Sequence, residues 1–151
     1  CSRPQIRDIG IIGAAVPEIT DAACSMCGAC VEACREGAVR LNESRQMPEI
    51  DRSKCLDCGQ CADACSTGTL RIARRACKVL LGGKLGRHPR LAEPLPGCYD
   101  ADEILDIVDR CVDFYKQYST GGKRFAQLCD ESGDALMAAL ADLIRQNEKG
   151  S

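Results

Sequence analysis

The sequence predicts an α+β fold in which a small cysteine-rich module is inserted between two strand-forming segments and followed by helices. Two cysteine runs of identical spacing occupy residues 24–34 and 55–65, and β-like apolar segments lie on both sides of them. The residues after Pro96 instead follow a helical period. A chain of 151 residues is long enough for one domain or for two small domains.

The composition excludes several classes of protein. A formal net charge of −2 argues against a protein that coats nucleic acid, and 45% hydrophobic residues argue against wholesale disorder. No apolar run approaches the ~18 residues of a membrane span. All the aromatic residues lie beyond residue 98, so something other than aromatic packing must hold the earlier part together. No signal peptide is visible, and we expect a cytoplasmic protein.

Eight of the thirteen cysteines form two runs of the pattern C-x2-C-x2-C-x3-C. The runs are Cys24, Cys27, Cys30, Cys34 and Cys55, Cys58, Cys61, Cys65. Each cysteine of the second run lies 31 positions after its counterpart, and residues 24–41 align with residues 55–72 without a gap. The pattern indicates an internal duplication of a small metal-binding unit.

Three chemistries compete for these cysteines. Disulfides belong to secreted chains, and an odd number of cysteines disfavours them. Zinc sites set two short cysteine pairs some distance apart, whereas three cysteines here follow one another at three-residue steps. That spacing places three thiolates around one tight loop, as three corners of an iron–sulfur cube require.

The two runs resemble those of bacterial ferredoxins that hold two [4Fe–4S] clusters. In such modules the fourth cysteine of each run binds the other cluster. The resemblance therefore implies one cluster on Cys24, Cys27, Cys30 and Cys65, and a second on Cys55, Cys58, Cys61 and Cys34. Proline usually follows the fourth cysteine, but Arg35 and Ser66 stand there in this sequence.

The module and its flanks predict short elements. We expect helical turns at 28–34 and 59–65, and strands at 39–41, 49–51 and 70–72 with Pro48 at a strand start. A strand built on Ile6, Ile9, Ile11 and Ile12 precedes the module, and another at 77–81 follows it. The predicted domains are 1–20 (entering strand), 21–73 (two-cluster module), 74–97 (return strand and basic segment) and 98–151 (helices).

The flanks resemble the siroheme-containing sulfite and nitrite reductases. CSRPQIRDIGIIG looks like the end of their siroheme motif, and KVLLGGKLGRHPRLAEPL is similar to the segment after their inserted ferredoxin domain. The order of the motifs resembles that of the anaerobic and dissimilatory sulfite reductase catalytic subunits. The resemblance implies reduction of sulfite or nitrite, electrons from a donor protein or subunit, and a homo- or hetero-oligomer in the full enzyme.

The same resemblance implies that the chain is part of a longer enzyme. Cys1 would be the last of four cysteines that hold a [4Fe–4S] cluster coupled to siroheme, and the other three would lie upstream. We therefore expect the 151 residues alone to bind no siroheme and to reduce neither anion. A processed lipoprotein is the alternative explanation of an N-terminal cysteine.

A basic segment lies after the module, because no acidic residue occurs from 64 to 92. With the family resemblance, we expect Lys84, Arg87, His88 and Arg90 to bind the anionic cofactor or substrate. Gly82, Gly83 and Gly86 would let the backbone approach a flat cofactor. The alternatives are a solvated loop or a weak nucleic-acid patch. We assign no metal to His88 and no catalytic residue in the chain.

Three helices are expected in the C-terminal segment. Asp100 and Glu103 form a capping-box pattern, and an apolar stripe continues from there to about Tyr118. That stripe consists of Ile104, Val108, Cys111, Val112 and Tyr115. Phe125, Leu128 and Cys129 mark a second helix closed near Gly133, and a third carries Leu136, Leu140, Leu143 and Ile144. The acidic residues of 102–113 predict a solvated face, or else a docking face.

Two classes of function remain open. The first is the electron-transfer module and part of the siroheme domain of an anaerobic sulfite reductase, with nitrite as the alternative substrate. The second is a stand-alone electron-carrier ferredoxin with a helical tail.

Overall fold

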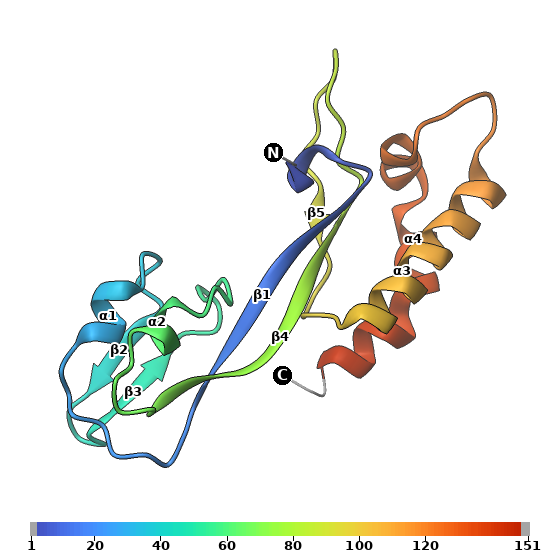
Figure 1. Cartoon of the computed structure of the whole chain (residues 1–151). Coiled ribbons are helices and arrows are strands. Elements are labelled where there is room, and N and C mark those ends of the chain that lie inside the picture. The colour runs from blue at the N-terminus through green and yellow to red at the C-terminus, as the bar shows by residue number, and fades with distance from the viewer. Residues whose placement is uncertain (1–2, 149–151) are drawn as a thin grey trace. The chain divides into compact units, whose positions relative to one another are not determined.

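The computed structural model describes residues 3–148 and divides into two compact units. One unit is Gly13–Ala76, and the other combines the residues up to Ile12 with those from Cys77 onward. Two sheets are present, one with the strand order β1-β4-β5 and one that pairs β2 with β3 (Figure 1). The strands are β1 (Ile9–Ile19), β2 (Val39–Asn42), β3 (Met47–Ile50), β4 (Leu70–Leu81) and β5 (Glu93–Pro94). The long strands β1 and β4 each carry residues of both units.

The helices are short in the cysteine-rich unit and long in the other unit. They are α1 (Ala29–Ala33), α2 (Gln60–Asp63), α3 (Ala101–Tyr118) and α4 (Phe125–Glu148). A single 3-10 turn, η1 (Pro4–Ile6), precedes β1. No helix within residues 3–148 is long and apolar enough to cross a membrane.

The unit Gly13–Ala76 contains both predicted helical turns, and the strands predicted at 39–41 and 49–51 pair there as a hairpin. In β2 and β3, Val39 pairs with Ile50 and Leu41 with Pro48. Pro48 is thus inside β3 rather than at its start, and it is tolerated because each strand of a two-stranded sheet is an edge strand. Cys30, Val39, Cys61 and Leu70 form the buried core of this unit.

Two strand predictions need correction. The predicted strand at Ile6 begins only at Ile9, because Pro4 lies at the first position of the 3-10 turn, which suits its fixed φ. The predicted strands 70–72 and 77–81 are one continuous strand, β4. Arg71 and Arg75 lie on its exposed side, where charged side chains are compatible with a strand. These residues interrupt the hydrophobic pattern of the sequence but not the strand.

The second unit has its own core around α3 and α4. Tyr99 and Ile107 are fully buried there, together with Val79 of β4 and Leu140 of α4. The capping box of α3 is confirmed: the Glu103 amide donates to Asp100 Oδ1 at 2.9 Å, and the Asp100 amide donates to Glu103 Oε2 at 2.8 Å. These two bonds satisfy amides that the first turn of a helix leaves without partners.

The predicted apolar stripe of α3 is rotated around the helix by part of a turn from the face that is buried. Ile107, Cys111 and Phe114 are its buried residues, whereas Val112 and Tyr115 are 41% and 38% exposed. The predicted second and third helices are both present within α4 and are separated at Ser132, whose φ of −141° is not helical, one residue before the predicted end at Gly133. The stripe expected from Leu136 to Ile144 is buried as predicted.

Candidate iron–sulfur and anion-binding sites

The cysteine runs lie in two loops that have the same backbone. Each loop leads into a short helix, and the third cysteine of each run, Cys30 or Cys61, is buried in that helix. The second cysteines, Cys27 and Cys58, are exposed. The duplication predicted from the sequence therefore extends to the burial of equivalent cysteines.

Both loops use left-handed backbone at equivalent positions. Gly28 and Gly59 have φ of 81° and 77°, and the residues two positions earlier, Met26 and Asp57, have φ of 56° and 55°. Left-handed conformations are uncommon for residues other than glycine. Two of them in five residues wind the loop tightly, so that successive cysteine side chains can face a common centre.

The fourth cysteine of the first run lies beside the second run. A pocket of about 190 Å³ in the cysteine-rich unit contains four of the eight cysteines in its wall. They are Cys34, Cys55, Cys58 and Cys61, accompanied by Pro17, Arg35, Glu36, Ala38, Val39, Leu56, Gly59 and Gln60. The structure thus gathers three cysteines of one run and one of the other.

The electrostatic influence between thiols follows the same grouping. Burial raises the pKa of the Cys61 thiol, and negative charge on Cys55 and Cys34 raises it further. Burial likewise raises the pKa of Cys30, with Cys65 and Cys24 adding to the effect. The fourth cysteine of the opposite run therefore contributes to the raised pKa of each buried thiol.

Cys65 differs from the buried thiols because several donors surround it. Burial raises its pKa, but hydrogen bonds from Thr67 and from the amides of Leu70, Thr67 and Gly68 outweigh this effect and lower the pKa to about 7. The Leu70 amide lies 3.3 Å from Cys65 Sγ. These donors favour the thiolate, which is the form that binds metals.

The donor set in this unit fits an iron–sulfur cluster in its chemistry. The side chains that converge are thiols, and soft thiolate ligands select iron–sulfur clusters, zinc or copper(I). Within residues 3–148, no three His, Cys, Asp or Glu side chains are placed to hold one shared metal ion. An iron–sulfur cube needs a different arrangement, because each of its four thiolates binds a separate iron.

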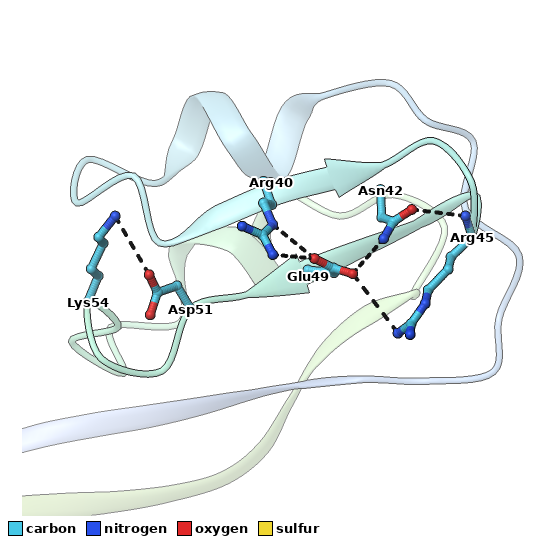
Figure 2. A network of polar contacts seen from close by, with 6 residues as sticks. All are labelled: Arg40, Asn42, Arg45, Glu49, Asp51 and Lys54. Atoms are coloured by element: carbon cyan, nitrogen blue, oxygen red, sulfur yellow. Dashed lines mark hydrogen bonds and ion pairs between the residues drawn. The ribbon is translucent and has the colours of Figure 1, made fainter.

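The β2–β3 hairpin connects Cys34 to Cys55, and a polar network braces it. Glu49 lies at the centre of this network (Figure 2) and accepts hydrogen bonds from Arg40 Nε at 2.9 Å and Asn42 Nδ2 at 2.6 Å. These bonds, the Asn42 bond first, lower the pKa of Glu49. Lys54 pairs with Asp51 at 3.6 Å just before Cys55. The network helps to hold the register of the β2–β3 hairpin, and this hairpin brings the chain from Cys34 back to Cys55 at the pocket.

The basic segment forms a backbone-paired hairpin in the other unit. The Lys84 amide donates to Arg90 O at 2.9 Å, and the Arg90 amide donates to Lys84 O at 3.0 Å. Arg90 is used internally: Nε lies 3.0 Å from Asp130, Nη1 donates to Gly82 O at 2.9 Å, and Nη2 lies 2.7 Å from Glu93. Lys84 also lies 3.7 Å from Asp130.

The four predicted anion-binding residues therefore divide into two pairs. Lys84 and Arg90 share Asp130, an acidic partner on α4 that the sequence reasoning missed because it lies 40 residues after Arg90. Arg87 and His88 are exposed at the turn of the hairpin and make no hydrogen bond or ion pair with the residues that the structure describes. Only the second pair is free to meet an external anion.

The glycine pair of this segment packs against the chain itself. The amides of Gly82 and Gly83 donate to the carbonyls of Asp8 and Arg7 at 2.8 and 2.9 Å. A Cβ on Gly83 would lie 2.7 Å from Arg7 O and 2.8 Å from Gln5 O. Packing within the chain thus accounts for both glycines: backbone of Gln5 and Arg7 lies beside Gly83, and the side chains of Arg90 and Cys129 lie beside Gly82. Gly86 has open space beside it.

The cysteines outside the two runs form no ligand cluster among the described residues. Cys1 lies outside the described residues. Cys111 is buried in the core of the helical unit, where burial raises its pKa to about 12. Cys98 is buried as well, whereas Cys77 and Cys129 are half-buried.

A duplicated set of cysteines in an α+β fold is typical of an iron–sulfur protein. The chain belongs to the nitrite and sulphite reductase 4Fe-4S domain family, whose domain it matches over residues 1–141. It is 38% identical over 128 residues to the coenzyme F420-dependent sulfite reductase of Methanocaldococcus jannaschii. That alignment covers 82% of this chain and 20% of the relative, so the chain spans about a fifth of the relative's length.

A solved structure has the same fold. The crystal structure of dissimilatory sulfite reductase I matches with a TM-score of 0.60 and 15% sequence identity. The match covers 91% of this chain and 39% of the other. At this identity the likeness supports the fold alone.

Proposed function

We propose that the chain is the electron-transfer module and part of the siroheme domain of an anaerobic, siroheme-dependent sulfite reductase, which reduces sulfite to sulfide. The observation that carries the proposal is the position of Cys34 beside Cys55, Cys58 and Cys61. The family membership and the sulfite reductase activity for which the M. jannaschii relative is named support sulfite as the substrate.

Two [4Fe–4S] clusters are part of this proposal. One would be held by Cys24, Cys27, Cys30 and Cys65, and the other by Cys55, Cys58, Cys61 and Cys34. When bound, such clusters accept and release single electrons. The chain supplies the thiolates, buries Cys30 and Cys61 away from water and fixes the loops through left-handed residues.

The contribution to siroheme would come from the hairpin of residues 84–90 and from Cys1. Arg87 and His88 are exposed and without internal partners among the described residues, so they are the side chains that can meet carboxylates or an oxyanion. Lys84 and Arg90 hold the hairpin against Asp130. In the whole enzyme we also propose a cytoplasmic location, a protein electron donor and an oligomeric assembly.

Anaerobic reconstitution with iron and sulfide tests the cluster proposal. We expect about eight irons per chain and the EPR signals of two [4Fe–4S] centres after reduction. About four irons with one EPR component, or bound zinc without labile sulfide, would contradict it. Sulfite and nitrite are distinguished by assaying sulfide and ammonia formation with the complete enzyme. A complete protein that passes electrons but forms neither product would support the stand-alone ferredoxin instead.

Replacing Arg87 tests the anion-binding part of the proposal. In the complete enzyme, we expect Arg87→Ala to weaken siroheme retention or to raise the sulfite concentration needed for half-maximal turnover. The expected change is about tenfold, because a hydrogen bond to a charged group contributes about 1.5–3 kcal/mol. Siroheme absorbance and steady-state kinetics measure both effects. Arg75→Ala, on the exposed side of β4, is the control for loss of positive charge. Full siroheme occupancy and unchanged kinetics in Arg87→Ala would favour a solvated loop.

A further inference from the structure

The duplication allows the two cysteine groups to be compared position by position. Their solvent exposure is nearly the same: Cys27 and Cys58 are both exposed, and Cys30 and Cys61 are 7% and 6% exposed. Reduction potentials of iron–sulfur clusters depend on solvent exposure, hydrogen bonds to sulfur and nearby charge. With exposure equal, a difference between the groups must come from hydrogen bonds or charge.

The fourth cysteines share one backbone donor of the same kind. The Ala38 amide donates to Cys34 Sγ at 3.2 Å, and the Leu70 amide donates to Cys65 Sγ at 3.3 Å. These two bonds shift both groups in the same direction. The amides of Thr67 and Gly68 are additional donors near Cys65, and they act in the same sense as the Thr67 hydroxyl.

The group that contains Cys65 has a hydroxyl beside its sulfur. Thr67 Oγ1 lies 3.4 Å from Cys65 Sγ and 2.7 Å from Thr69 Oγ1. The buried Thr69 hydroxyl also lies 3.2 Å from Ala23 O. An iron-bound Cys65 has no proton, so Thr67 must be the donor in that contact. Charge-assisted bonds are stronger than neutral ones, which orients the Thr67 hydroxyl toward the thiolate. The single Thr69 hydrogen can be donated either to Ala23 O at 3.2 Å or to Thr67 Oγ1 at 2.7 Å, and with Thr67 turned to the thiolate it serves the shorter contact with Thr67.

The group that contains Cys34 has carboxylates at the equivalent positions. Glu36 stands 31 positions before Thr67 and lines the pocket of this group. Asp57 stands 31 positions after Met26, and its Oδ1 lies 3.6 Å from Cys55 Sγ. Arg52 Nη1 lies 3.8 Å from the same oxygen and offsets part of the Asp57 charge. One group thus has a hydroxyl and a thioether where the other has two carboxylates, Glu36 with Arg35 beside it in the pocket wall and Asp57 with Arg52 nearby.

We propose that these side chains set the two groups at different reduction potentials, with the higher potential at the group of Cys24, Cys27, Cys30 and Cys65. The inference rests on the proposed function, in which each group holds a [4Fe–4S] cluster. Reduction adds negative charge, which a hydroxyl donor stabilises and a carboxylate repels. An electron supplied by a chemical reductant therefore resides mainly at the Cys65 end. An added electron therefore favours one end of the duplicated unit, although the backbone conformations of the two loops are similar.

Thr67→Val removes the hydroxyl and keeps the branched shape. In the reconstituted chain, titrated with dithionite and followed by EPR, we expect the higher of two midpoint potentials to fall. A bond from a neutral donor to a charged sulfur changes the reduction equilibrium about tenfold, which is about 59 mV for a one-electron couple. Thr67→Ser retains the hydroxyl and is the matched control, so its midpoint potentials should equal those of the wild type.

Asp57→Asn tests the opposite group. We expect the lower midpoint potential to rise, by less than in the Thr67 experiment because Arg52 already offsets part of the charge. The higher midpoint potential should stay unchanged.

The outcomes separate this inference from the proposed function. A wild-type chain with fewer than two cluster components would overturn the proposed function itself. Two components with no shift in Thr67→Val, or with a shift of the lower component, would overturn the inference and leave the clusters in place. If both variants moved the same component, the two groups would not be divided as we propose.

Discussion

Replacing Cys34 by alanine should remove the cluster bound mainly by the other cysteine run. Because Cys34 lies in the pocket with Cys55, Cys58 and Cys61, its loss leaves three thiolates for a cube that needs four. We expect reconstituted Cys34→Ala to fall from about eight irons to about four. The EPR component retained should be that of Cys24, Cys27, Cys30 and Cys65.

The matched control is Cys65→Ala, which should give the same iron content but retain the other component. Thr67→Val identifies the components: its midpoint shift should persist in Cys34→Ala and disappear in Cys65→Ala. A Cys34→Ala protein that keeps the cluster of Cys55, Cys58 and Cys61 would contradict the exchange of the fourth cysteine. Cys111→Ala is a second control, since that thiol is buried in the helical core.

Substituting Gly59 by alanine should destabilise the cysteine-rich unit far more than the equivalent change at Gly28. Both residues have left-handed backbone, which costs an L-residue about 1–2 kcal/mol. A Cβ at Gly59 would also lie 2.8 Å from Ala15 Cβ of β1, whereas a Cβ at Gly28 meets nothing within 4 Å. Overpacking of this kind costs about 1–3 kcal/mol more.

The measurement is the urea midpoint of the two reconstituted proteins under anaerobic conditions. Gly28→Ala serves as the control for backbone strain, and the difference between the two variants isolates the contact with Ala15. Equal urea midpoints for both variants would show that β1 moves enough to accommodate the new methyl group. Ala15→Gly in the Gly59→Ala background should recover part of the lost stability, because it removes the atom that the new methyl group meets.

The asymmetry at Gly59 illustrates how β1 changes a duplicated unit. The Ala15 amide donates to Asp57 O at 2.7 Å, and Ala15 pairs with Cys58 in a parallel bridge. The equivalent loop at Gly28 has no such cover at its glycine. Two loops of the same spacing therefore tolerate different substitutions, although their cysteines are equally exposed.

Features that depend on neighbours in the chain could be predicted from the sequence. The spacing within each cysteine run and the capping box at Asp100 involve residues within a few positions of one another. The short helices at the third cysteines and the strands near 39–41 and 49–51 are of the same kind, and the structure places them within about two residues of the prediction. Local sterics and hydrogen bonding are sufficient to specify such features.

Which side chains meet across the chain became known from the folded structure. Asp130 pairs with Lys84 and Arg90, so a basic segment that looked uniform separates into a braced pair and an exposed pair. Backbone of Gln5 and Arg7 lies beside Gly83, and the buried stripe of α3 is set by what it packs against rather than by its own apolar residues. An ion pair or a packed face depends on distance in space, whereas a sequence gives only distance along the chain.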